Sequence, residues 1–214
     1  MDDNPTAVKG KLIVFEGIDR SGKTSQIKLL SERLTLENIP HQTIGFPDRS
    51  TRIGSLLEDY LKRKDEEMPR QALHLLFSAN RWENMSRIAK LLESGTHVLL
   101  DRYAYSGISY SVGAEGLNFD WCKVPDCGIV EPDVVFFMNV SAQNTCTRSS
   151  FGDEIYEKVK TLEKVYDVFR RFDNLPYWRD IDASDDPSVI HEKIYKTTME
   201  IIKGPDRPLT KLKF

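Results

Sequence analysis

The chain has 214 residues, which suits one compact domain whose core is large enough to need neither disulfides nor a structural metal. Its 30 Lys and Arg residues face 33 Asp and Glu residues, and the net charge of −3 lacks the cationic surplus of a nucleic-acid binder, so we expect a small anionic ligand. Three cysteines without zinc-like spacing predict reduced thiols and a cytoplasmic or also nuclear protein. No apolar run approaches the ~18 residues that cross a bilayer, so we expect no membrane contact.

A phosphate-binding loop follows the first apolar stretch of the chain. Residues 12–15 predict a short buried strand, and residues 26–37 carry apolar side chains at helical spacing. Between them lies the pattern G-x-x-x-x-G-K-[ST], formed by Gly17, Gly22, Lys23 and Thr24. In such loops the backbone N–H groups surround a phosphate, the lysine reaches its oxygens and the hydroxyl meets Mg²⁺. The strand–loop–helix context, with a helix N-terminus at the anion, therefore predicts nucleotide binding.

The next part of the chain alternates strands and helices. The expected elements are a strand at 42–46, a turn at 46–51, helices at 53–61 and 69–93, and a strand at 96–100. The last of these strands brings Asp101 and Arg102 to its carboxyl end. Open α/β sheets bind their ligands at that edge, so both residues are candidates for the site.

The second half continues the alternation. Its expected helices are residues 103–112, 119–128, 142–148, 156–172 and 186–202, and its expected strands are residues 132–140 and 177–182. Small, acidic and glycine-containing residues interrupt the helical pattern at 149–155, and we interpret them as a mobile lid. No repeat or interdomain linker is visible, so we expect one α/β domain over residues 1–214.

Four motifs, taken in order, resemble the thymidylate kinases. They are Asp-Arg-Ser-Gly-Lys-Thr in the phosphate loop, Phe-Pro-Asp-Arg, Leu-Phe-Ser-Ala-Asn-Arg-Trp-Glu, and Asp-Arg-Tyr-Ala-Tyr-Ser-Gly. The phosphate loop alone fits many nucleotide hydrolases, but the order of all four, over residues 10–202, is distinctive. The resemblance implies a single P-loop kinase domain with a five-stranded parallel sheet flanked by helices on both faces. It also implies a homodimer that uses ATP, with Mg²⁺, to convert dTMP to dTDP.

Phosphoryl transfer needs positive charge along the phosphates and little covalent chemistry. The resemblance implies that Lys23 and Arg20 serve ATP, and that Arg49 and Arg102 hold the acceptor phosphate. A solvated surface ion pair is the alternative for Arg49 or Arg102. The implied catalytic residues are Asp19, Arg20, Lys23 and Arg102. The implied ATP-binding residues are Gly17, Arg20, Ser21, Gly22, Lys23, Thr24, Ser25 and Arg148.

The acceptor side of the site is implied by the same resemblance. Phe77 and Arg81 lie four residues apart on one helix face, where the ring would stack on thymine and the guanidinium would donate to its O4 atom. Ordinary core packing is the alternative for Phe77, and also for Tyr110, which would crowd the sugar 2′ position. Asp19 would accept the 3′-hydroxyl. The full dTMP set is Asp19, Phe46, Arg49, Phe77, Arg81, Arg102, Ser106, Tyr110 and Tyr156, with a cis bond expected between Phe46 and Pro47.

The metal and the lid complete the expected site. Thr24 would bind Mg²⁺ directly and Asp101 would hold it through water. Arg148, at the base of the lid, would cover adenine, and an exposed helix-end charge is its alternative. Because residues 149–155 contain no basic side chain, we expect Arg20 to contact the β/γ bridge. Leu162 and Ser109 depart from the family pattern, which commonly has glutamine and alanine there.

Two other functions fit parts of the sequence. A related nucleoside monophosphate kinase with a broader acceptor range, such as one that uses dGMP, would keep the same loop and metal chemistry. A nucleotide-dependent switch would phosphorylate no acceptor, but the guanine-reading motif Asn-Lys-x-Asp is not present in the sequence. The long helix at 69–93 has more apolar positions than one buried stripe uses, so we expect it and the helix at 53–61 to pair with a second copy of the chain.

Overall fold

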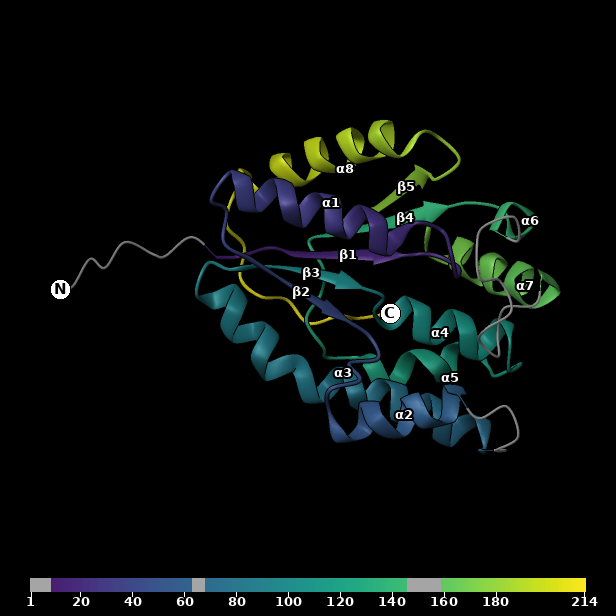
Figure 1. The fold of residues 1–214 in the computed structure, drawn as a ribbon. Helices are drawn as coiled ribbons and strands as arrows, with labels where there is room; N and C mark the ends of the chain where they lie inside the picture. The colour runs from purple at the N-terminus through teal and green to yellow at the C-terminus, as the bar shows by residue number, and fades with distance from the viewer. Residues whose placement is uncertain (1–8, 63–67, 146–158) are drawn as a thin grey trace.

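The computed structural model describes residues 9–62, 68–145 and 159–214. Its centre is a parallel sheet of five strands in the order β2-β3-β1-β4-β5 (Figure 1). The strands are β1 (Leu12–Glu16), β2 (His41–Gly45), β3 (His97–Asp101), β4 (Val134–Asn139) and β5 (Trp178–Asp182). The apolar runs form the central strands because helices cover both of their faces, whereas the two edge strands are partly exposed.

Helices cover both faces of this sheet. Figure 1 shows α1 and α8 on one side and α2 to α5 on the other, with α7 beside α4. The helices are α1 (Lys23–Leu36), α2 (Arg52–Lys62), α3 (Arg70–Glu93), α4 (Ala104–Gly113), α5 (Phe119–Lys123), α6 (Ala142–Thr145), α7 (Val159–Phe169) and α8 (Pro187–Ile202). The predicted α/β fold with a five-stranded parallel sheet flanked on both faces is confirmed.

The register of β1 and β3 determines where the site forms. In this pair Phe15 lies opposite Asp101, and Arg102 N donates to Phe15 O at 3.0 Å. The two strands therefore end at the same level of the sheet edge, where β1 continues into the phosphate loop and β3 continues into Arg102. From β1 the chain crosses to the β2 side first and reaches β4 on the other side later, which makes this edge the topological switch point.

The predicted boundaries need corrections at a few places. The helix expected at 119–128 is shorter, because α5 ends at Lys123 and a 3₁₀ turn, Val124–Asp126, follows with Pro125 near its start. The helix expected at 156–172 is described from Val159, and its last residues, Arg170–Phe172, form a 3₁₀ turn. The expected lid at 149–155 and the end of the helix expected at 142–148 lie outside the described residues. The cis bond between Phe46 and Pro47 is confirmed.

The C-terminal residues dock on the same chain. Leu212 is fully buried, and its N–H and C=O bond to Ile129 O at 2.8 Å and to Gly128 N at 3.0 Å. This segment therefore closes the core beside the residues that lead into β4. None of the helices in the described residues is long and apolar enough to span a membrane.

Candidate active site

A cleft of about 560 Å³ opens at the carboxyl edge of β1, β2 and β3. It is bordered by the loops after these strands and by one face each of α3 and α4. Most of the predicted site residues line it together, although they are separated by up to 91 positions in the sequence. They are Asp19, Arg20, Gly22, Lys23, Thr24, Ser25, Phe46, Arg49, Phe77, Arg81, Asp101, Arg102, Ser106 and Tyr110.

The phosphate loop has the conformation that its glycines permit. Gly17 has a φ of 141°, and a Cβ there would lie 2.8 Å from Ser21 Oγ and 2.9 Å from Met138 O, so only glycine fits. Gly17 and Ser21 lie under the cleft and do not line it. Gly22, in the left-handed region, caps α1, so the helix N-terminus faces the cleft, as anion binding requires.

Lys23 is a buried cation. Its Nζ donates to Ile18 O at 2.7 Å and to Gly17 O at 3.0 Å. Burial, with a further contribution from Arg102, lowers the pKa of Lys23 to about 8. A phosphate near this nitrogen would stabilise its charged form, so Lys23 is suited to bind an anion.

Arg102, Asp19 and Tyr110 form one hydrogen-bonded group. Arg102 Nη2 forms an ion pair with Asp19 Oδ1, and Tyr110 Oη donates to Asp19 Oδ2 at 2.6 Å. Burial alone would raise the pKa of Asp19, but Arg102 and Lys23 outweigh it and lower this pKa. Arg102 has a φ of 69° and Arg20 a φ of 62°, a region that non-glycine residues rarely adopt. Such backbone strain concentrates at functional sites, because the surrounding structure must hold it.

Glu16 lies beneath this group, and sequence reasoning missed it. The carboxylate is fully buried and accepts hydrogen bonds from Tyr103 N at 2.8 Å, from Ser106 N at 3.1 Å and from Ser106 Oγ. Ser106 Oγ in turn accepts from Arg102 Nη1 at 3.2 Å. Burial raises the pKa of Glu16, against the lowering by Ser106 and Arg102. Ser106, which we expected at the sugar, therefore also links Glu16 to Arg102.

The residues expected to bind Mg²⁺ lie in contact. Thr24 Oγ1 donates to Asp101 Oδ2 at 2.7 Å. A hydroxyl and a carboxylate supply the hard oxygen atoms that Mg²⁺ prefers, and this ion commonly takes only one or two protein ligands together with substrate phosphates. Within the described residues no group of three or more His, Cys, Asp or Glu side chains forms a fuller metal site. The donor set at Thr24 and Asp101 fits Mg²⁺ bound with a nucleotide.

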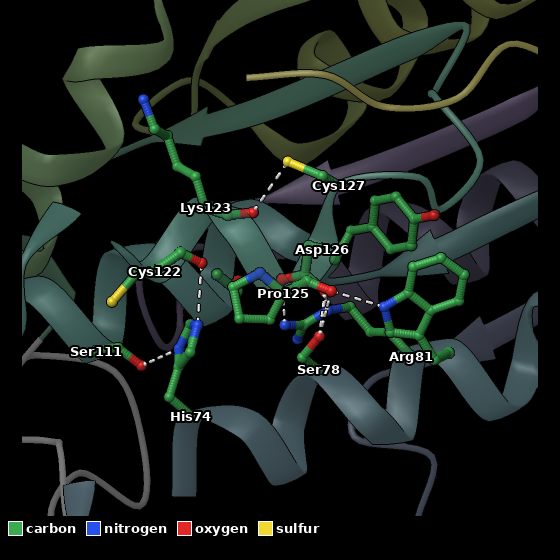
Figure 2. Close-up of polar contacts among 12 residues, drawn as sticks. His74, Ser78, Arg81, Ser111, Cys122, Lys123, Pro125, Asp126 and Cys127 are labelled. Carbon is green, nitrogen blue, oxygen red and sulfur yellow. Dashed lines mark hydrogen bonds and ion pairs between the residues drawn. The ribbon is translucent and has the colours of Figure 1, made fainter. Parts of the chain in front are cut away.

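The far end of the cleft is built around a buried ion pair, shown in Figure 2. Arg81, only 2% exposed, donates from Nε to Asp126 Oδ1 at 2.9 Å and from Nη2 to Asp126 Oδ2 at 2.6 Å. Ser78 Oγ also donates to Asp126 Oδ1, at 2.9 Å. A Cβ on Gly107 would lie 2.7 Å from the guanidinium, so the glycine leaves room for it. Phe77 is partly buried and lines the cleft, outside the main core cluster.

The turn that carries Arg49 is held in place by hydrogen bonds between Asp48 and Asn80. Asp48 N donates to Asn80 Oδ1 at 2.7 Å, and Asn80 Nδ2 donates back to Asp48 O at 3.2 Å. A Cβ on Gly54 would meet Asp48 O at 1.7 Å, so α2 packs directly on this turn. Arg49 lines the cleft and also lies 3.7 Å from Glu58 across an exposed surface, so both of the roles that we considered for it have a structural counterpart.

Some predicted residues cannot be placed, and some important ones were not predicted. Arg148 and Tyr156 lie outside the described residues. Leu162 and Ser109 are fully buried, Leu162 in the core, and neither lines the cleft. The residues that sequence reasoning missed are Glu16, Asn80 and Asp126, together with Ser111, another residue of the cleft lining. A charge at the end of an apolar strand could have indicated Glu16, but a single aspartate after Val-Pro gives no local sign of its partner Arg81.

The fold and the cleft are those of a P-loop phosphotransferase. A parallel α/β sheet places a phosphate-binding loop at its switch point, and the cationic side chains of Arg49 and Arg102 line the same cleft. The family model for thymidylate kinase matches residues 15–194. The chain is 48% identical over 198 residues to thymidylate kinase of Plasmodium falciparum, covering 92% of this chain and 94% of that one. It is 37% identical over 209 residues to the Homo sapiens enzyme, covering 96% and 98%.

A solved structure agrees with these relatives. The structure of thymidylate kinase from Candida albicans, described as revealing the origin of broad substrate specificity, superposes with a TM-score of 0.88 at 33% identity. The match covers 97% of this chain and all of that one. The chain therefore belongs to the thymidylate kinase family.

The buried carboxylate of Glu16 generates a test by pH. The raised pKa of Glu16 means that its carboxylate binds a proton more tightly in the folded state than in the unfolded state, where its pKa is near 4.5. The resulting stabilisation is complete below that value and is lost as the pH rises through the folded-state pKa. Glu16→Gln cannot ionise, so its Tm minus that of the parent should become more positive as the pH rises above about 4.5.

The matched control is Glu200→Gln, at an exposed position on α8, for which the same difference should stay flat. Thermal unfolding of the three proteins across the pH series measures both differences. A Glu16→Gln difference that is constant, or that falls with pH, would contradict a raised pKa.

Proposed function

We propose that this chain, working as one P-loop kinase domain, transfers the γ-phosphoryl group of ATP to dTMP, giving dTDP and ADP. The observation that supports this most strongly is the continuity of one cleft from the phosphate loop to a base-sized end. Lys23 and Thr24 border it on one side, Arg102 and Asp19 at the middle, and Arg81 at the far end. The free thiols Cys122 and Cys127 support the expected cytoplasmic, or also nuclear, location.

In the proposed mechanism the protein positions phosphates and stabilises charge. The N–H groups at the start of α1 and the Lys23 ammonium bind the β- and γ-phosphates. Arg49 and Arg102 hold the acceptor phosphate in line with the γ-phosphorus. Mg²⁺ held by Thr24 and Asp101, when bound, would offset negative charge on the donor phosphates. Gly17 and Ser21 shape the loop from beneath, and Ser25 lines the cleft at the start of α1.

The acceptor nucleoside would be oriented by the opposite wall. Asp19, which already accepts from Arg102 and Tyr110, has remaining lone pairs for the 3′-hydroxyl. Phe77 stacks on thymine, Arg81 donates to its O4 atom, and Phe46 forms an apolar wall. We assign Tyr156 to the sugar and base of dTMP and Arg148 to adenine from the family pattern alone.

A panel of acceptors tests the reaction. ADP release from MgATP is measured with dTMP, dUMP, dGMP, UMP and AMP. We expect dTMP to give the highest kcat/KM, with AMP and UMP lower by at least tenfold. The related enzyme from Candida albicans is described in terms of broad substrate specificity, so a broader acceptor range is the second candidate, and dGMP turnover comparable to dTMP turnover would support it. ADP release that does not depend on any acceptor would indicate a switch and contradict both.

Arg20 is the proposed stabiliser of the transferring group. It follows Asp19 in the phosphate loop, lines the cleft and has a φ of 62°. Arg20→Ala should lower kcat by on the order of 10³-fold with a much smaller change in either KM, the pattern of a contact made mainly in the transition state. Steady-state kinetics of Arg20→Ala and Arg148→Ala measure this. If Arg20→Ala keeps kcat within about fivefold of the parent, or if Arg148→Ala loses far more, the stabilising role belongs to Arg148 and not to Arg20.

We also propose a homodimer. Large apolar side chains are exposed together on the α2, α3 and α5 side of the molecule: Leu56, Leu75, Trp82, Trp121 and Val124. A stable twofold interface buries on the order of 1,600 Å², and burial of these exposed apolar side chains would favour its formation. Sedimentation velocity at micromolar concentration should show a species of twice 24.6 kDa, and Leu75→Glu should shift it toward the monomer. A species of 24.6 kDa alone in the parent would contradict the dimer.

A further inference from the structure

A buried histidine connects the wall of the cleft to α5. His74, on α3, is fully buried. Its Nδ1 lies 2.7 Å from Ser111 Oγ on α4, and its Nε2 lies 3.0 Å from the Cys122 carbonyl oxygen on α5, as Figure 2 shows. Ser111 lines the same cleft as Phe77 and Arg81. Neither His74 nor Ser111 has a role in the proposed mechanism so far.

The two contacts determine which ring nitrogen carries the proton. A carbonyl oxygen only accepts hydrogen bonds, so Nε2 must carry a hydrogen and donate it to Cys122 O. Burial, followed by the charge of Arg81, lowers the pKa of His74. Asp126 and the Cys122 and Gly107 carbonyls act in the opposite direction but do not outweigh burial, so the ring is neutral near pH 7. A neutral ring with its proton on Nε2 has a lone pair on Nδ1. The Ser111 hydroxyl must therefore donate its hydrogen to His74.

The direction of the hydrogen bond between Ser111 and His74 determines what Ser111 can offer to a ligand in the cleft. With its hydrogen committed to His74, Ser111 Oγ offers only lone pairs to a ligand. Arg81 offers only N–H donors, and Asp126 holds its guanidinium through Nε and Nη2. The cleft wall thus presents an acceptor and a donor from neighbouring helices. A pyrimidine-2,4-dione has the complementary edge, an O4 acceptor next to an N3–H donor, whereas cytosine has an amino donor next to an N3 acceptor.

We propose that His74 is a positioning residue for base recognition: by taking the Ser111 hydroxyl proton it makes Ser111 an acceptor for the N3–H group of the base. The proposal rests on the proposed function, because it specifies how the dTMP kinase site distinguishes thymine from cytosine. A hydroxyl with a free rotor would accept from N3–H or donate to a bare N3 equally well. His74 removes that second possibility.

The test compares His74→Gln with the parent. Glutamine keeps an N–H group near the Nε2 position for Cys122 O but leaves Ser111 without its acceptor. We expect the KM for dTMP to rise about 5- to 10-fold with kcat within about twofold. The kcat/KM ratio of dTMP to 5-methyl-dCMP should fall by a similar factor. The dTMP to dUMP ratio should not change, because uracil has the same O4 and N3–H edge.

The chain supplies a matched control. His41, on β2 away from the cleft, makes the same two kinds of contact, with Ser31 Oγ at 2.8 Å and with Ile39 O at 2.8 Å. His41→Gln should leave both kcat/KM ratios unchanged. If His74→Gln does not fold, Ser111→Ala and Ser111→Thr replace it: alanine should reproduce the lower dTMP to 5-methyl-dCMP ratio, and threonine, which keeps the hydroxyl, should retain the parent ratio.

The outcomes separate this proposal from the function on which it rests. Absence of dTMP-dependent ADP release by the parent protein would overturn the proposed function. Normal dTMP turnover by the parent, with the dTMP to 5-methyl-dCMP ratio unchanged in folded His74→Gln and in Ser111→Ala, would overturn only the role of His74 and Ser111. A loss of kcat/KM that is equal for dTMP, dUMP and 5-methyl-dCMP would assign His74 to packing and also contradict the proposal.

Discussion

Four charged groups buried at the ends of β1 and β3 constrain the rest of the molecule. Glu16, Asp19, Lys23 and Arg102 would each be costly to bury alone. Neighbouring charges outweigh the effect of burial on the pKa of Asp19 and Arg102, and they offset only part of it for Glu16 and Lys23. The network forms only because the parallel register of β1 and β3 ends both strands at one level. The left-handed backbone at Arg102 turns its side chain back toward the phosphate loop. Sheet order, strand register and site chemistry are thus parts of one arrangement.

The cleft separates two kinds of recognition along its length. At the sheet edge, positive charge and helix N–H groups suit phosphates, whose charge is large and whose geometry is adaptable. At the far end, the guanidinium of Arg81, paired with Asp126, and the hydroxyl of Ser111, bonded to His74, suit the edge of a base. Bases differ there in the positions of their hydrogen-bond donors and acceptors. In the second region Asp126 and His74, which contact the guanidinium and the hydroxyl, are themselves buried and hydrogen-bonded. We therefore propose that phosphoryl transfer and base selection depend on different elements, the first on β1 and β3 and the second on α3 to α5.

The sequence predicted the parts of this arrangement that have local patterns. Gly17 and Lys23 belong to a spaced motif, the buried strands are continuous apolar runs, and Phe77 and Arg81 share a helix face, so fold class and cleft lining followed directly. The supporting residues lacked such patterns. Asp126 lies 45 positions from Arg81, and His74 lies 37 from Ser111, so their pairing depends on how α3, α4 and α5 pack. The shortened α5 likewise follows from Pro125, which a helical period alone does not reveal.

We propose that the charge network at the ends of β1 and β3 binds the acceptor nucleotide. A crystal structure of the protein with dTMP and a non-hydrolysable ATP analogue tests it most directly. We expect the guanidinium of Arg102 to contact the dTMP phosphate, Asp19 to accept a hydrogen bond from the 3′-hydroxyl, and Glu16 to keep its bonds to Tyr103 N and Ser106. A complex in which dTMP binds with its phosphate away from Arg102, while Arg102 remains paired only with Asp19, would contradict it.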